Sequence, residues 1–166
     1  THWREIQHHS AAGATDRETM NLKQHELSAV FPSMPQDDID ALALDIEAHG
    51  LHSAITLYKG EVLDGWHRYL ACEIAGVNPR TQDYKGSDPA AFAKSHNWHR
   101  RHMTASQKAM TQVDLSGWRE SGVTSRSVTV TDLPPTAAMM AKAAGVSESM
   151  IIKAKAVAAS GTKELK

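Results

Sequence analysis

Two short groups of polar residues have the side-chain types and the spacing needed to hold a phosphorylated ligand. The first, at 64–68, directly follows the apolar pair at 62–63. Gly65 would let a phosphate approach the backbone where a helix begins, and the unpaired amides of a first helical turn favour anions. Arg68 can give two parallel donors to phosphate oxygens, and His67 can add another. This pattern predicts an anion site; a glycine-capped turn with a surface arginine is the alternative.

The second group lies at 95–102 and has the sequence SHNWHRRH. Asn97 offers a neutral side-chain oxygen, which could join a magnesium ion beside phosphates. Arg100 and Arg101 add positive charge next to it. The group also contains histidines at every third position, a spacing that could bind zinc on one side of a helix: His96, His99 and His102. Phosphate binding and transition-metal binding are both open interpretations of this group.

Two side chains of the first group are also candidate catalytic residues. A metal-dependent nuclease or a phosphotransferase would use Asp64 or His67 as its base. A single carboxylate provides few ligands for the metal ion of a metal-dependent hydrolase. The sequence therefore favours binding of a ligand, with an enzyme as the alternative.

Charge is distributed unevenly along the 166 residues, although the formal net charge is only −1. Residues 1–93 contain 7 Lys and Arg against 14 Asp and Glu, whereas residues 94–166 contain 11 against 5. A basic segment suits a polyanion such as DNA, because each phosphate contact releases condensed counterions. An ordinary helical domain with a solvated charged surface is the alternative interpretation.

The composition also excludes some classes of protein. The single cysteine, Cys72, excludes a disulfide framework and fits a reducing compartment. No stretch approaches the roughly 18 consecutive apolar residues of a membrane span. We therefore expect a cytoplasmic protein that does not bind a membrane.

Residues 1–22 are expected to form a tail, and 23–95 an acidic domain that holds the first group. Apolar spacing from Ile39 to Ile46 predicts a helix that has Asp37 and Asp38 in its first turn and ends at Gly50. Two short strands are expected next, at 55–57 and 62–63, joined by a hairpin turn at Lys59-Gly60. A helix over 66–75, ended by Gly76, and then a polar loop with Pro79, Gly86 and Pro89 complete this domain.

Residues 96–166 are expected to form a helical DNA-binding domain. A short helix at 89–95 precedes it, and Thr104 with Gln107 has the spacing of a capping box for a helix that runs to about residue 121. The segment 123–131 could be a loop or a strand.

A helix-turn-helix is predicted at 136–158, with its turn at Gly145 and a cap at Ser147. The second of its helices would contact DNA, and the residues expected to do so are Ser147, Ser149, Lys153 and Lys155, together with Arg101. A plain helical hairpin is the alternative.

Three of these segments, in this order, resemble the ParB/sulfiredoxin superfamily over roughly residues 25–160. The helix that ends at Gly50 is followed by LHSAI at 51–55, which resembles the family's L-x-x-P-I strand. The sequence VLDGWHRYLA at 62–71 resembles the phosphate-binding G-E-R-R-x-R-A box of ParB and the G-G-C-H-R box of sulfiredoxins. HNWHR at 96–100, followed by Met103, Thr104 and Ala109, resembles the E-N-x-Q-R-x-x-L-(S/T)-P box.

The resemblance is better to ParB-like proteins of plasmids and phages than to chromosomal partition proteins. It implies an α+β fold, in which a small mixed sheet with helices is followed by an all-α helix-turn-helix domain. It also implies a nucleotide-regulated DNA-binding protein for partition or transcriptional regulation, which binds CTP with Mg²⁺ and acts as a homodimer. The nucleotide-binding residues implied are His52, Ser53, Gly65, Trp66, His67, Arg68, Asn97 and Arg100, with Asn97 holding the metal.

Two substitutions within the boxes narrow the activity that the resemblance implies. Trp66 stands where sulfiredoxins have their catalytic cysteine, so sulfinic-acid reduction is not expected. His96 stands where ParB has the glutamate associated with nucleotide hydrolysis. Binding is therefore implied more strongly than turnover, and a weak CTPase, a ParB-like nuclease and a phosphotransferase are the enzymatic alternatives. A structural adaptor with a vestigial nucleotide site is a third interpretation, which the same two substitutions leave open.

Overall fold

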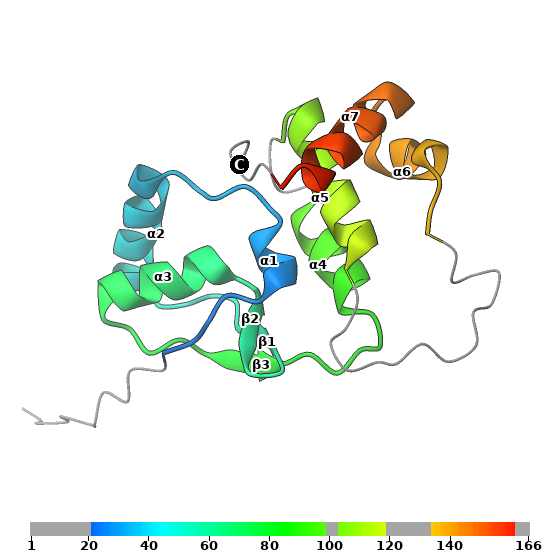
Figure 1. The fold of residues 1–166 in the computed structure, drawn as a ribbon. Helices are drawn as coiled ribbons and strands as arrows, with labels where there is room; N and C mark the ends of the chain where they lie inside the picture. Colours follow the sequence, from blue (N-terminus) through cyan, green and yellow to red (C-terminus); the bar gives the residue numbers. More distant parts are fainter. Residues whose placement is uncertain (1–20, 99–102, 119–133, 162–166) are drawn as a thin grey trace, which may run out of the picture.

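The computed structural model describes residues 21–98, 103–118 and 134–161 of the chain. Within them, seven helices accompany one three-stranded mixed sheet, which confirms the α+β class predicted from the sequence. The sheet and the first helices lie in one half of Figure 1, and the last helices in the other. None of the described helices has the length and apolar character needed to cross a membrane.

The sheet has the strand order β2-β1-β3. Strands β1 (Ile55–Tyr58) and β2 (Glu61–Asp64) form the predicted antiparallel hairpin. Its turn residues, Lys59 and Gly60, both have positive φ, at 52° and 81°, as tight hairpin turns commonly require.

Strand β3 (Thr81–Asp83) pairs parallel to β1 and lies in the segment expected to be a polar loop. That expectation was wrong for these residues. The strand has only three residues, TQD, and two of them are exposed, so it has none of the apolar alternation that identifies a strand in a sequence.

The two faces of β2 pack against different helices. Val62 clusters with Ile55 and Tyr69, and Tyr69 belongs to α3 (Trp66–Ala75). Leu63, the next residue, points to the opposite face and joins the cluster that contains Leu27 and Ala93. Strand β2 is therefore buried on both sides, and its end is held between α3 and the helices of the other face.

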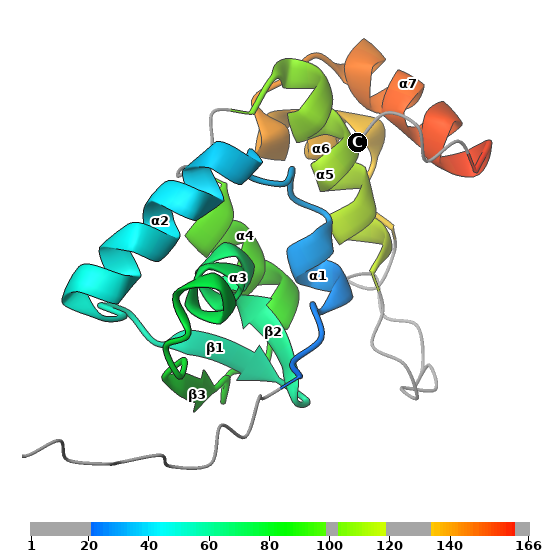
Figure 2. The same ribbon diagram turned by 90° about the vertical axis from the view of Figure 1, so that its left-hand side faces the viewer.

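Helix α2 (Gln36–His49) packs along α3 and away from the sheet (Figures 1 and 2). Ile39, Ala43 and Ile46 of α2 form an apolar cluster with Ala71 and Cys72 of α3. Burial raises the pKa of the Cys72 thiol. The helix ends at Gly50, and Asp37 and Asp38 lie in its first turn, both as predicted.

Helices α1 (Glu26–Ala29) and α4 (Pro89–Asn97) cover the other face of β2. Helix α4 extends two residues beyond the expected end at residue 95. It therefore crosses the boundary expected between the two domains.

Helices α5 (Ala105–Gly117), α6 (Ala137–Ala144) and α7 (Glu148–Ala159) pack on one another in the second half of the chain. The capping box of Thr104 and Gln107 is confirmed, with both of its hydrogen bonds present. The described part of α5 ends at Gly117, and the segment 123–131 lies outside the described residues.

The predicted helix, turn and helix are present, with the turn at Gly145. Ile151 of α7 is fully buried in the same apolar cluster as Leu27, Leu63 and Ala93 of the first half. One hydrophobic core is therefore continuous through both halves of the chain.

Candidate functional site

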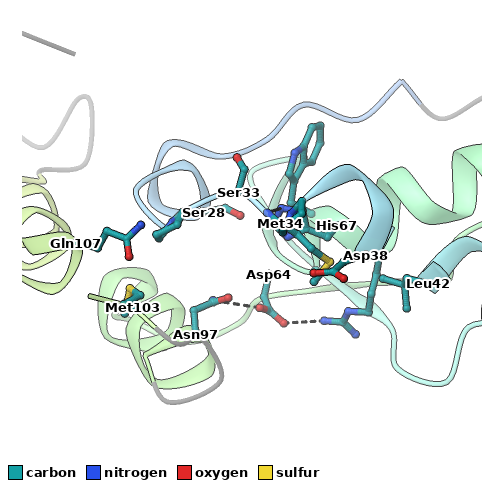
Figure 3. A pocket seen from close by; sticks show the side chains of 15 residues that line it. Ser28, Ser33, Met34, Asp38, Leu42, Asp64, His67, Asn97, Met103 and Gln107 are labelled. Carbon is teal, nitrogen blue, oxygen red and sulfur yellow. Dashed lines mark hydrogen bonds and ion pairs between the residues drawn. The ribbon is translucent and has the colours of Figure 1, made fainter. Parts of the chain in front are cut away.

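A cavity of about 490 Å³ lies where β2 ends and α3 begins (Figure 3). Its other walls come from α1, the segment before α2, the end of α4 and the start of α5. Its volume is in the range of small-molecule sites. The residues expected to bind a nucleotide that line it are Gly65, Trp66, His67, Arg68 and Asn97.

Gly65 is the N-cap of α3 and has the left-handed backbone conformation, with φ 96° and ψ 24°. A Cβ at this position would lie 2.8 Å from an Arg68 guanidinium nitrogen. The positive φ favours glycine, and a Cβ would also force the guanidinium to move from its hydrogen bonds. The first amides of α3 have no partner within the helix, as at every helix N-terminus, and this end of the helix lines the cavity.

The guanidinium of Arg68 makes contacts on two sides of the site. One terminal nitrogen donates to Asp64 Oδ2 at 2.8 Å. The other donates to the carbonyl oxygens of Ser53 and Ala54 at 2.8 and 3.1 Å. Arg68 therefore ties the end of β2 to the segment before β1, in addition to lining the cavity where a phosphate was expected.

Asp64 is the centre of this network, and only 6% of its surface is exposed. Its Oδ2 accepts from Arg68, and its Oδ1 accepts from Asn97 Nδ2 at 3.3 Å. The same Asn97 nitrogen donates to Ala93 O at 2.9 Å. This places the nitrogen of the amide against Asp64, so coordination of a cation through Asn97 Oδ1 would require the amide to turn.

His67, the other candidate base, is 8% exposed and holds the segment before α2. Its Nε2 accepts the backbone N–H of Met34 at 3.0 Å. An imidazole that accepts at Nε2 is neutral and carries its proton on Nδ1. The lone pair that a general base would use is therefore already shared with the Met34 amide.

The structure does not bring all of the expected nucleotide-binding residues together. Trp66 lines the cavity and stacks on Tyr69, with 5.3 Å between the ring centroids. His52 and Ser53 are exposed and do not line the cavity, although their carbonyl oxygens accept from Arg80 and Arg68.

Arg100, Arg101, His99 and His102 lie outside the described residues. His96 is described, and its Nδ1 is hydrogen-bonded to Phe92 O at 3.0 Å. In the described part of the chain, no three His, Cys, Asp or Glu side chains come close enough together to hold a metal ion.

Several residues of the cavity wall were not predicted to belong to the site. They come from α1, from the segment around Pro32 and Pro35, and from the start of α2, and they include Ser28, Ser33, Met34 and Asp38 (Figure 3). Gln107 of α5, expected only as part of a capping box, also lines the cavity. Pro32 and Pro35 favour a turn or an extended segment here, but nothing in the sequence indicates that this segment faces α3.

The charged groups on the described wall of the cavity are two carboxylates, Asp38 and Asp64, and one guanidinium, Arg68. Because Arg68 pairs with Asp64, one carboxylate remains in excess. This wall favours a cation, or an anion that brings a cation with it.

The predicted DNA-contacting residues lie on α7 and at its start. Ser149 and Lys153 are exposed, and Lys155 is half-buried. Ser147 occupies the N-cap position, but its side chain does not bond a helical amide; its Oγ pairs with Ser149 Oγ at 3.0 Å. Ser147 is therefore the N-cap residue, as predicted, but it lacks the side-chain hydrogen bond expected of a cap.

Ile152 also lies on the exposed side of α7, with 57% of its surface exposed. Ile152 was not among the residues expected to contact DNA. Its neighbour Ile151 is buried, and the alternation of the two shows which side of α7 faces solvent.

Comparisons with known proteins assign no family. The chain matches no protein-family model, and no curated protein matches it significantly.

Replacing Gly65 with alanine is expected to lower the free energy of unfolding by about 2 kcal/mol, since the new Cβ adds backbone strain and displaces Arg68. Gly60→Ala is the matched control, because Gly60 also has positive φ but its Cβ would meet no atom within 4 Å. That control should lose only about 1 kcal/mol, from backbone strain alone. Urea unfolding followed by circular dichroism measures the free energy of unfolding of both variants. Equal losses would show that the contact with Arg68 does not contribute to the effect.

Proposed function

We propose that this protein binds a nucleoside triphosphate with magnesium in the cavity at the start of α3, and DNA through α6 and α7. The observation that carries the proposal is the meeting, in one cavity, of the Gly65 helix start with the oxygen-bearing side chains of Asp64 and Asn97. A helix N-terminus favours phosphate, and carboxylate and amide oxygens are ligands that magnesium prefers.

The excess negative charge of the described wall supports the binding of nucleotide as its magnesium complex. A free triphosphate would meet Asp38 and Asp64 with one guanidinium to offset them. Asn97 Oδ1 and a carboxylate oxygen of Asp64 would hold the magnesium ion, and phosphates and water would complete its shell. The ion would supply the charge that joins the phosphates to this wall.

The helix-turn-helix supports the DNA-binding part of the proposal. Helix α7 exposes Ser149 and Lys153 along one side, and it belongs to the half of the chain in which basic residues outnumber acidic ones. A helix of this kind can enter the major groove while lysines contact phosphates. A homodimer would place two such helices on one duplex. Light scattering with and without DNA measures the oligomeric state.

The nucleotide part of the proposal is tested by calorimetric titration with CTP, ATP and GTP, each with magnesium and with a chelator. We expect at least one to bind with magnesium and to lose affinity with the chelator. Asn97→Ala should weaken binding about tenfold or more, which corresponds to roughly 1.4 kcal/mol. Asn78→Ala, at an exposed site that does not line the cavity, is the control. Failure of all three nucleotides to bind would refute this part.

A metal-dependent nuclease or phosphotransferase is the second candidate, and the presence of Asp38 in the same cavity as Asp64 favours it. The sequence pattern offered only Asp64 for this chemistry, and the cavity adds the carboxylate of Asp38. Incubation of plasmid DNA with magnesium or manganese tests it. If the chain cleaves DNA and both Asp64→Asn and Asp38→Asn abolish the cleavage, the site is catalytic and is not only a binding site.

A further inference from the structure

A second cavity, of about 680 Å³, lies between α1, α5 and the end of α7. Its volume is in the range of small-molecule sites. The described residues that it shares with the cavity at the start of α3 are Pro32, Ser33 and Gln107, which form a wall between the two. Gly65 and Arg68 line the first cavity and not the second, so the second is a separate space.

Much of the wall of this second cavity is apolar. Val30 and Phe31 line it after the end of α1, Met110 lines it from α5, and Val157 lines it from α7. Thr111, which is 2% exposed, donates from its Oγ1 to Val30 O at 3.2 Å and so ties α5 to the end of α1. A wall of this composition suits the hydrocarbon part of a ligand.

The charged groups on the described wall are two carboxylates, Glu26 of α1 and Asp114 of α5. Asp114 lies four residues after Met110, so both are on one side of α5. Glu26 Oε1 accepts from Trp118 Nε1, a neutral donor that positions the carboxylate without offsetting its charge. No Lys, Arg or His is among the described residues that line the cavity.

Helix α7 ends at the same cavity, where Val157, Ala158 and Gly161 belong to the wall. The carbonyl groups of its last turn carry the partial negative charge of a helix C-terminus, which attracts a cation. The helix end and the two carboxylates would repel an anion. Together with the apolar wall, they favour an organic cation.

We propose that this cavity binds a small molecule that has an apolar body and a primary ammonium group. The ammonium group lies against the carboxylates of Glu26 and Asp114, and the hydrocarbon lies against Met110 and Val157. The ligand differs in charge from both a nucleotide and DNA, so the site does not depend on the proposed function.

The test uses 2-phenylethylamine as the probe, with 2-phenylethanol as its neutral match and phenylacetate as its anionic match. Each is titrated into the full chain labelled with ¹³C at the methionine methyl groups, and binding is followed by NMR. The resonance of Met110, assigned with Met110→Leu, should shift with the amine. Those of Met34 and Met103, which line the first cavity, should not shift. The amine should bind about tenfold or more tightly than the alcohol, as expected for hydrogen bonds to charged groups, and phenylacetate should not bind.

Two variants test the charge and the space of the cavity separately. Asp114→Asn keeps the shape and should weaken amine binding about fivefold or more, with little change for the alcohol. Asp83→Asn is its control, since Asp83 is exposed and lines neither cavity. Ala158→Phe fills the cavity and should abolish the Met110 shift. Ala159→Phe, at the next residue of α7 and outside the cavity wall, should keep it.

Equal affinity for the amine and the alcohol would overturn the proposal, because the carboxylates would then have no part in binding. Absence of a Met110 shift at the highest amine concentration would also overturn it, as would a shift of Met34 or Met103 in its place. If Asp114→Asn does not fold, the two phenylalanine variants still decide, since Ala158 is exposed and its replacement leaves the core intact. Unchanged binding in Ala158→Phe would place the probe elsewhere and overturn the proposal.

Discussion

Replacing Arg68 with alanine is expected to lower the free energy of unfolding by about 3 kcal/mol. The guanidinium is the charged partner of Asp64, whose side chain is only 8% exposed, and its own side chain is 20% exposed. Removal of one member of such a pair leaves a buried carboxylate without its countercharge. It also leaves the carbonyl oxygens of Ser53 and Ala54 without this donor. Urea unfolding followed by tryptophan fluorescence measures the loss.

Arg80→Ala is the matched control for this prediction. Arg80 also donates to two backbone carbonyl oxygens of the segment before β1, those of Leu51 and His52, but its side chain is exposed. Its removal should cost about 1 kcal/mol or less, as for ordinary hydrogen bonds. Equal effects at the two arginines would show that the ion pair with Asp64 contributes nothing.

A double substitution separates the charge of Arg68 from its shape. Asp64→Asn in the Arg68→Met background removes the buried carboxylate that Arg68→Met leaves unpaired, so part of the lost stability should return. Since Arg68 is part of the fold as well as of the cavity, nucleotide binding by its variants has to be measured at a temperature where the chain remains folded.

Ile151→Ala is expected to lower the free energy of unfolding by about 3 to 4 kcal/mol. Ile151 is fully buried between α7 and the core that α5 shares with the first half of the chain. Truncation to alanine removes apolar contacts and leaves a cavity that the surrounding helices fill only in part. Thermal and urea unfolding should both show the loss.

The next residue along the chain, Ile152, is also an isoleucine, and its variant is the matched control for this prediction. Ile152→Ala removes the same atoms from a side chain that is 57% exposed, and it should change the stability by about 0.5 kcal/mol or less. A large loss at both positions would mean that both sides of α7 are buried. The contrast between the two variants therefore also tests which side of α7 is available for DNA.

Much of the fold follows from local signals in the sequence. Gly50, Gly76 and Gly145 end helices where they were expected to, and Thr104 with Gln107 forms the expected capping box. Each of these depends on residues within one turn of helix, so spacing alone identifies them. Strand β3 depends on pairing with β1 across more than twenty residues of chain, and its three residues lack any apolar pattern.

The site was predictable only in part, for a related reason. The sequence pattern around Gly65 and Arg68 predicts a strand-to-helix turn, and these residues lie at one. Asn97 was predicted from the polar and basic residues next to it in the sequence. Whether Arg68 binds a phosphate or a carboxylate depends on the direction of the Asp64 side chain. The spacing of residues in the sequence does not determine that direction. Asp38 enters the cavity because the segment around Pro35 folds back toward α3, and that contact is made in three dimensions only.

The first described residues protect the sheet from pairing with other chains. The segment before α1 runs along β2, where Val62 N–H donates to Lys23 O at 2.8 Å and His25 N–H donates to Val62 O at 3.1 Å. These bonds occupy edge groups of β2 that would otherwise be open to a strand from another molecule. The edge strand β3 is only three residues long and ends in Asp83, which makes it a poor template for strand addition. Removal of residues 21–25 is therefore a route to aggregation through the β2 edge.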